Sequence, residues 1–366
     1  MKGVSELKAI LGQQLFWNKA RLDCFARMLL ALMAVKTVNL REVALSFASK
    51  ATVDSRYKRL QRFFALFTID YTDLARWIFK LFFPSDKKVY IAIDRTNWYW
   101  GKSKINVFVL SIAHEGLAIP IFWIMLNKAG NSNFDEQRKL INNFVKAFGK
   151  DCIQGILADR EFGSGRLFAW LNKKKIPFYI RIKEGSQIKI HPKQKHWTAK
   201  KLFKNINPKE CDYYINYVYV FGEKVRLAAG RSESGELMII ATNAEPKNAV
   251  PIYLRRWEIE SLFQSLKGRG FNFENTHMIH PERIAKLMAL LAVGFCWAHK
   301  VGEWCAEKKP IPMKKFKNQS RPQYSYFRYG LDRIREILLN AVSNGRRLRL
   351  FIRKLKLENH NMGACP

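Results

Sequence analysis

Four residues between positions 253 and 267 have the types and spacing that a phosphoryl-transfer site needs. They lie in PIYLRRWEIESLFQSLKGRG, residues 251–270, which opens on proline and closes on glycines, so the pattern predicts a helix of about five turns. At about 100° per residue, Tyr253, Arg256 and Lys267 project within about 40° of Glu260. One face then carries an acid, two cations and a phenol. Taken alone, a solvated helix with an i,i+4 Arg/Glu pair explains the segment equally well.

Two aspartates supply further acids at the ends of predicted core strands. Asp94 follows KVYIAI, and Asp159 follows CIQGILA. A single aspartate at a strand end is more often a turn former or a helix cap. Because the ends of neighbouring strands lie close together in an αβ sheet, Asp94, Asp159 and Glu260 together form a candidate catalytic triad.

Three clustered carboxylates need a compensating cation, and a divalent metal is the usual one. Oxygen ligands with no histidine or cysteine beside them favour Mg²⁺, with Mn²⁺ able to substitute. Two such ions would activate a water or a DNA 3′-hydroxyl and stabilise the leaving oxygen of an in-line displacement.

The spacing of Tyr253, Arg256, Glu260 and Lys267 resembles the YREK signature of IS4-family DDE transposases. AIDRTNW and ADREFG, which contain Asp94 and Asp159, are similar to the first and second acidic motifs of the same family. The resemblance implies an RNase H-like fold in which the two aspartates and the glutamate are the catalytic metal ligands. It also implies that the tyrosine, arginine and lysine of the signature contact DNA phosphates.

Composition points to a polyanionic partner. The chain has 366 residues and a formal net charge of +34, far more than solubility requires. Double-stranded DNA is the expected partner, and no membrane is expected, because the basic residues are spread over the whole chain. Six distant cysteines without a CxxC pair, and a start with no apolar signal region, predict a cytoplasmic protein, and the family resemblance implies a bacterial one. The longest apolar run, 287–298, is too short to cross a bilayer.

Residues 1–85 are helical in pattern and form a predicted DNA-binding domain. Asn39 is placed to cap a short helix over 40–49, and a second helix follows over 55–67. Two short helices joined by a tight turn suggest a helix-turn-helix. An ordinary basic surface helix remains the alternative for the second one. Its candidate DNA-binding residues are Arg56, Lys58, Arg59 and Arg62.

The middle of the chain predicts an α/β core. Its elements follow the order strand, strand, strand, helix, strand, helix, strand, and His114-Glu115-Gly116 joins the second and third strands as a hairpin. The helix over 133–148 is expected to be capped by Ser132. The predicted divisions are the helical domain 1–85, an RNase H-like core in two parts (86–183 and 251–305), a β-rich insertion 184–250, and a basic helical C-terminal region 306–366 that includes an irregular linker.

These observations favour an insertion-sequence transposase. It would bind terminal inverted repeats, cleave the element ends and transfer the 3′-hydroxyls into target DNA, acting as a homodimer on DNA. Two alternatives stay open: a metal-dependent nuclease of the same fold without strand transfer, and a non-catalytic DNA-binding relative of a transposase.

Overall fold

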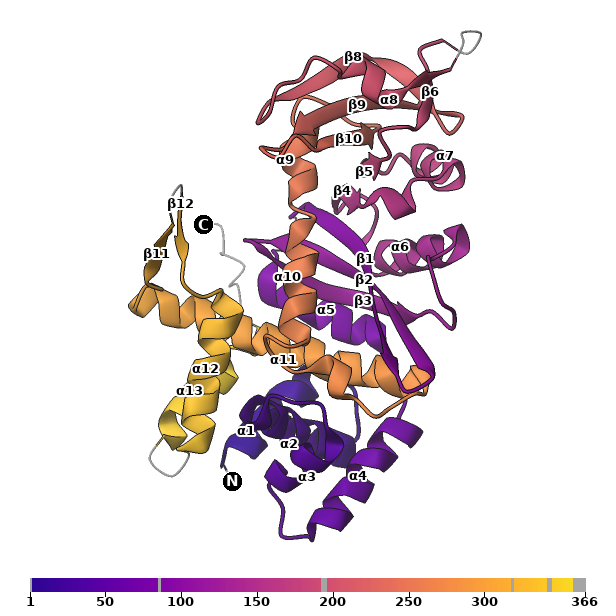
Figure 1. The fold of residues 1–366 in the computed structure, drawn as a ribbon. Helices are drawn as coiled ribbons and strands as arrows, with labels where there is room; N and C mark the ends of the chain where they lie inside the picture. Colours follow the sequence, from indigo (N-terminus) through magenta and orange to yellow (C-terminus); the bar gives the residue numbers. More distant parts are fainter. Residues whose placement is uncertain (1, 85–86, 192–195, 317–318, 341–343, 358–366) are drawn as a thin grey trace, which may run out of the picture. The chain divides into compact units, whose positions relative to one another are not determined.

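The computed structural model describes the chain except for residues 1, 85–86, 192–195, 317–318, 341–343 and 358–366 (Figure 1). The chain divides into two compact units. The first unit contains residues 1–85, 98–105 and 263–366, and the second contains residues 86–97 and 106–262. The five segments predicted from the sequence stay a prediction.

A mixed sheet of ten strands is the framework of the second unit. Its neighbours run in the order β3-β2-β1-β4-β5-β10-β9-β8-β6-β7. β1, β4 and β5 pair in parallel, whereas β5, β10, β9, β8, β6 and β7 follow one another antiparallel. The strands are β1 (Val89–Trp100), β2 (Ser103–His114), β3 (Leu117–Met125), β4 (Ile153–Ala158), β5 (Phe178–Ile182), β6 (Gln187–Lys189), β7 (Trp197–Thr198), β8 (Cys211–Val220), β9 (Glu223–Arg231) and β10 (Leu237–Thr242).

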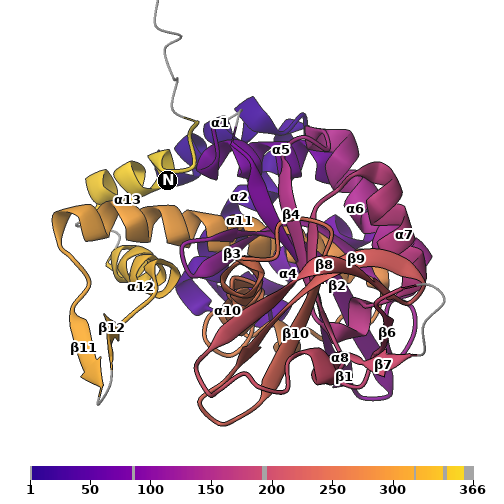
Figure 2. The same ribbon diagram turned by 90° about the horizontal axis from the view of Figure 1, so that it is seen from above.

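The predicted order of core elements is confirmed. β1, β2 and β3 are followed by α6 (Phe134–Phe148), β4, the short η1 (Arg160–Phe162), α7 (Gly165–Lys174) and β5. The β2–β3 hairpin turns through Glu115 and Gly116, both at positive φ, which matches the twist of paired strands. Figures 1 and 2 show α6 and α7 side by side against the sheet.

Three details of this core differ from the expectation. Asn133, not Ser132, caps α6, because its side chain forms a capping box with Glu136. β1 continues beyond Asp94 to Trp100, since its second half forms a hairpin with β2. The strands predicted as an insertion extend the same sheet, because β10 pairs with β5. α8 (Ala199–Leu202) lies between β7 and β8.

The helix predicted over 251–270 is two helices. α9 (Ala249–Leu254) is followed by a tight turn and then by α10 (Trp257–Leu266). At the turn the backbone N–H groups of Arg255 and Arg256 bond to Ile252 O and Tyr253 O, three residues back rather than four. The turn changes the direction in which Tyr253 and Arg256 project relative to an unbroken helix.

The first unit is helical. It contains α1 (Lys2–Gln14), α2 (Lys19–Val35), α3 (Leu40–Ser46), α4 (Val53–Leu66), α5 (Tyr71–Phe82), α11 (Pro281–Lys308), α12 (Tyr326–Leu339), α13 (Gly345–Arg353) and the short η2 (Phe273–Asn275). α11 and α12 lie side by side (Figure 2) and pack closely at Gly330, where a Cβ would lie only 1.8 Å from Ala298 O. The close approach therefore requires glycine at this position. The predicted C-terminal linker was partly wrong: β11 (Met313–Phe316) and β12 (Gln319–Pro322) pair there, although their charged residues give no apolar alternation.

α11 is long and apolar enough to cross a membrane by length and composition. However, 83% of its most apolar window is buried inside the protein. Phe295 and Trp297 are among its fully buried side chains, and Gly294 lies against Leu29 and Leu32 of α2. Such burial is typical of a core helix, as the sequence predicted for 287–298.

Candidate active site

Asp94 and Asp159 follow the last paired residues of two neighbouring parallel strands. Ile93 of β1 is in register with Ala158 of β4, so the next residue on each strand is an aspartate. Parallel strands point the same way, and both acids therefore emerge at one edge of the pairing. The backbone N–H of Arg95 donates to Asp94 Oδ1 at 2.7 Å, which fixes that carboxylate against the strand.

Arg256 joins two of the three candidate acids. Its Nη1 donates to Asp94 Oδ2 at 3.3 Å, and its Nη2 donates to Glu260 Oε1 at 2.7 Å. The Nε of Arg256 lies 3.2 Å from the hydroxyl of Tyr253, which in turn donates to Asp159 Oδ1 at 3.2 Å. One hydrogen-bonded network thus connects all three carboxylates through two residues of the broken helix.

Burial governs the electrostatics of this network. Desolvation raises the pKa of Asp94 from 3.8 to about 6, although its backbone bond to Arg95 and the charge of Arg256 oppose the shift. Burial also raises the pKa of Tyr253 to about 12, so its phenol remains protonated and able to donate. Burial alone would lower the pKa of Arg256, but Tyr253, Glu260 and the two aspartates outweigh it and raise that pKa. The arginine therefore stays charged among the acids.

The chemistry of these donors fits a divalent cation. Three carboxylates meeting at one network are hard oxygen ligands, and burial raises the pKa of Asp94, which a cation beside it would oppose. Among the described residues, these three acids do not form a group whose ligand oxygens all lie within 4.8 Å of one another. Arg256 instead supplies the positive charge between Asp94 and Glu260. A metal held by these acids would have to take over that role.

Sequence reasoning missed a second ion pair beside the acids. The Nε and Nη2 of Arg95 donate to the two carboxylate oxygens of Glu161 at 2.8 and 2.7 Å, a bidentate contact. Arg95 also donates to Gly130 O and to Asn131 Oδ1, both at 2.8 Å. This ion pair connects Arg95, which follows Asp94, to Glu161, which lies two residues after Asp159. The signal was present, since Asp94-Arg95 and Asp159-Arg160-Glu161 each place opposite charges together.

Residues 85–297, more than half of the chain, match the family model described as the transposase DDE domain. The chain belongs to this family. No curated protein matches it. A cryo-EM structure of the piggyBac transposase synaptic complex with hairpin DNA is similar at 12% sequence identity and a TM-score of 0.46, over 98% of this chain and 84% of that one. A similarity this low carries no argument, so membership rests on the sequence match.

Lys267 lies in the first unit, whereas the other three residues of the DDE domain's proposed signature lie in the second. There its Nζ pairs with Glu274 Oε1 at 2.7 Å and lies 5.6 Å from the ring centre of Trp98. The structure therefore gives Lys267 a set of partners within the first unit. Its predicted role as a phosphate contact stays a prediction.

The four N-terminal cations fall into two groups. Arg56 bonds to the carbonyls of Ala51 and Ser49 at 2.9 and 2.7 Å, and Arg59 bonds to Asp23 at 3.0 Å. These two arginines stabilise the fold around α3 and α4. Lys58 and Arg62 are exposed on α4. The exposed pair is better suited to DNA, and Asn39 caps α3 as predicted.

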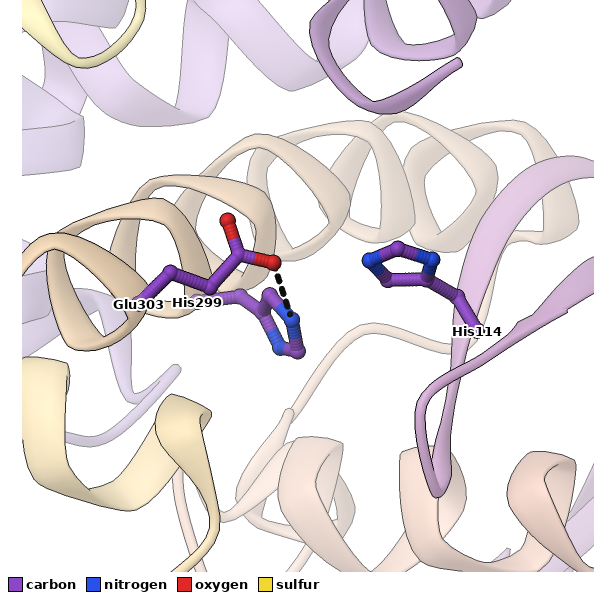
Figure 3. Close-up of side chains that lie close together, drawn as sticks. All are labelled: His114, His299 and Glu303. Carbon is purple, nitrogen blue, oxygen red and sulfur yellow. Dashed lines mark ion pairs between the residues drawn. The ribbon is translucent and has the colours of Figure 1, made fainter. Parts of the chain in front are cut away.

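One buried histidine of α11 lies beside a carboxylate of the same helix. The Nε2 of His299 lies 3.1 Å from Glu303 Oε1, the pair joined by the dashed line in Figure 3. Glu303 also pairs with the Lys300 ammonium at 2.6 Å. His114, also labelled there, belongs to the second unit and pairs with Leu117 across the β2–β3 hairpin. Both residues of the α11 pair belong to the first unit.

Proposed function

We propose that the chain is an insertion-sequence DNA transposase of the IS4 type with an RNase H-like core. It binds the terminal inverted repeats of its element, cleaves the DNA at the ends and transfers the 3′-hydroxyls into target DNA as a homodimer in the bacterial cytoplasm. The observation that carries this proposal is the network in which Tyr253 and Arg256 connect Asp94, Asp159 and Glu260. Membership of the transposase DDE domain family supports it.

The three acids are the proposed metal ligands, for two Mg²⁺ ions with Mn²⁺ able to substitute. Bound there, the ions would supply an activated oxygen nucleophile and stabilise the leaving oxygen. The rest of the chemistry belongs to the chain. Tyr253 holds the Asp159 carboxylate through its hydroxyl and does not act as a nucleophile, because burial keeps it protonated. With metal ions in its place beside Asp94 and Glu260, Arg256 would offer a planar, bidentate contact for a DNA phosphate.

Glu260 and Glu258 provide a matched pair for the test. Both lie on α10, but Glu258 pairs with Arg255 at 3.3 Å and takes no part in the network of the three acids. A plasmid carrying the gene and its native flanks is incubated with purified protein in Mg²⁺ or EDTA, and new 3′ ends are mapped. We expect metal-dependent ends at the element boundaries with the wild type and with Glu258→Gln, and none with Glu260→Gln.

The alternatives predict other outcomes. Tight binding to the boundaries without any cleavage would identify a non-catalytic DNA-binding protein. Cuts without joining to a target plasmid would identify a nuclease, because only a transposase joins the released ends to new DNA. If Glu258→Gln and Glu260→Gln reduced the number of new 3′ ends equally, the network of the three acids would not be the catalytic site.

A further inference from the structure

A basic cavity lies within the first unit, where the ends of α5 and α13 meet the second half of α11. Its volume is about 450 Å³, and its cations are Lys80, Lys300, Arg353, Lys354 and Lys356. Two carboxylates, Glu303 and Glu307, share the lining. Positive charge therefore exceeds negative charge in this cavity. None of the residues that line it belongs to the network of the three acids.

Three of these cations form no ion pair with a carboxylate of the described residues. Lys300 pairs with Glu303 at 2.6 Å, and Arg353 pairs with Glu6 at 2.7 Å. Over the part of the chain that the structure describes, no ion pair joins Lys80, Lys354 or Lys356 to an acid. Lys80 lies on α5, whereas Lys354 and Lys356 follow the last residue of α13, so only the tertiary fold gathers the three lysines.

Two buried indoles hold the end of α13 in place. Trp297 Nε1 donates to Phe351 O at 2.8 Å, and Trp77 Nε1 donates to Leu355 O at 3.3 Å. The last turn that carries Lys354 is therefore anchored to α11 and α5. The Lys354 ammonium lies 5.0 Å from the ring centre of Trp304, which is part of the cavity wall. These bonds fix the backbone at the end of α13, from which the half-buried Lys354 and the exposed Lys356 extend.

Helix ends alone do not account for this concentration of charge. A cation near a helix C-terminus gains about 0.3–1 kcal/mol, which explains single lysines in a last turn. Several like charges around one cavity repel one another, and the repulsion is relieved when an anion enters. The site is thus complementary to an anion.

The basic lining continues beyond this cavity. A second cavity of about 540 Å³ shares Trp304 and Leu350 with the first and contains Lys308 and Arg347. The Lys308 ammonium lies 4.1 Å from the Trp304 ring centre. α13 has nine residues, which is about 13 Å of helix. An anion that extends over both cavities fits this lining better than a single small ion does.

We propose that the cavity bounded by Lys80, Trp304, Lys354 and Lys356 binds backbone phosphates of double-stranded DNA. The inference rests on the proposed function for the identity of the polyanion. It assigns a DNA contact to the ends of α5 and α13, which contain neither the signature residues nor the cations of α4. Phosphates would be held by ammonium groups, with no reading of base sequence.

The test is a titration of the full chain with a labelled duplex carrying an element end, in EDTA and over a series of salt concentrations. The test variant is Lys80→Gln/Lys354→Gln/Lys356→Gln. Its control, Lys139→Gln/Lys146→Gln/Lys150→Gln, changes the same charge on exposed lysines of α6 and the residue following its C-cap. Since each phosphate contact contributes about 0.9 to the slope of log K against log salt, the test variant should lose about 2–3 from the slope and bind about 10–100-fold more weakly.

A second variant separates loss of the site from loss of folding. Lys80→Arg/Lys354→Arg/Lys356→Arg keeps the charges and should retain DNA affinity within about threefold, with an unchanged thermal midpoint. Equal slopes for the test and control variants would overturn the proposal. So would a site that only small anions fill, seen as inorganic phosphate raising the thermal midpoint through these lysines while DNA affinity stays constant.

The two proposals fail in different ways. A wild type that binds DNA through these lysines but makes no ends at the element boundaries contradicts the proposed function alone. A wild type that makes those ends, with DNA affinity unaffected in the test variant, contradicts this inference alone.

Discussion

The acids of the second unit and the lysines of the first-unit cavity differ in whether their charged groups have partners inside the protein. Around Arg256, each of the three carboxylates accepts a hydrogen bond from Tyr253 or Arg256, so its charge is partly compensated inside the protein. In the cavity lined by Trp304, three lysines form no ion pair with an acid of the described chain: Lys80, Lys354 and Lys356. The difference teaches that acids already bonded inside the protein must exchange those bonds to accept a ligand, whereas lysines without an acidic partner can accept an anion directly.

The largest expected effect comes from removing one acid of the network that connects Asp94, Asp159 and Glu260. Asp159→Asn keeps the hydrogen bond from Tyr253 but loses a charged metal ligand, so end formation in Mg²⁺ should fall by about 10³-fold or more. DNA affinity in EDTA should change by less than about threefold, because this acid holds metal rather than phosphate. Quantifying mapped 3′ ends checks this, with Asp151→Asn, in the exposed turn before β4, as control. Full activity in Asp159→Asn would show that the cluster is not catalytic.

Removing the internal cation should destabilise the metal-free protein. Arg256→Ala leaves Asp94 and Glu260 without their shared partner, and breaking a buried pair in this way costs about 3–5 kcal/mol of unfolding free energy. Arg255→Ala should cost less, since the Arg255 side chain is 38% exposed.

Urea unfolding in EDTA measures both values, and added Mn²⁺ should recover more stability in Arg256→Ala than in Arg255→Ala. This differential recovery would show that metal replaces the guanidinium. If both variants gained equally from Mn²⁺, the arginine would not occupy the place of a metal ion.

The stability of the metal-free protein should depend on pH through Asp94. Its pKa is raised from 3.8 to about 6, so between these values the folded protein keeps a proton that the unfolded chain has lost. The contribution of this group is present below pH 3.8 and is lost as the pH rises to about 6.

Asp94→Asn removes that dependence and should gain about 2–3 kcal/mol relative to the wild type between pH 4 and pH 7. Unfolding free energies in EDTA across this range check the sign. A difference that shrank with rising pH would mean that Arg256 stabilises the charged carboxylate more than burial opposes it.

The smallest expected effect concerns the exposed cations of α4. Lys58→Gln/Arg62→Gln should weaken DNA binding by about 5–30-fold at physiological salt while changing stability by less than about 0.5 kcal/mol. Arg56→Gln should instead lower stability, because its guanidinium bonds to carbonyls around the α3–α4 turn. Anisotropy titrations and thermal unfolding separate the two effects. Equal losses of affinity and stability in both variants would remove the distinction.

Much of the core was predictable because it depends on local pattern. The alternation of strands and helices, the hairpin at Glu115-Gly116 and the Asn39 cap follow from apolar periodicity and turn chemistry. The break at Arg255 was not predictable, since both halves have good helical sequence and the turn is accompanied by long-range bonds such as Arg255 to Ala113 O. The β11–β12 pair was missed because charged strands give no apolar alternation.

The sequence by itself determined which charged groups exist, their order along the chain and the net positive charge that requires a polyanion. Only the tertiary structure decided which charged groups have partners inside the protein. Asp94 and Arg256 are 162 positions apart and meet through non-local packing, while Lys80 and Lys354 meet because α5 and α13 are anchored by buried indoles. Burial and partner choice are set by such distant contacts, and they decide whether a charge supports the fold or remains available to a ligand.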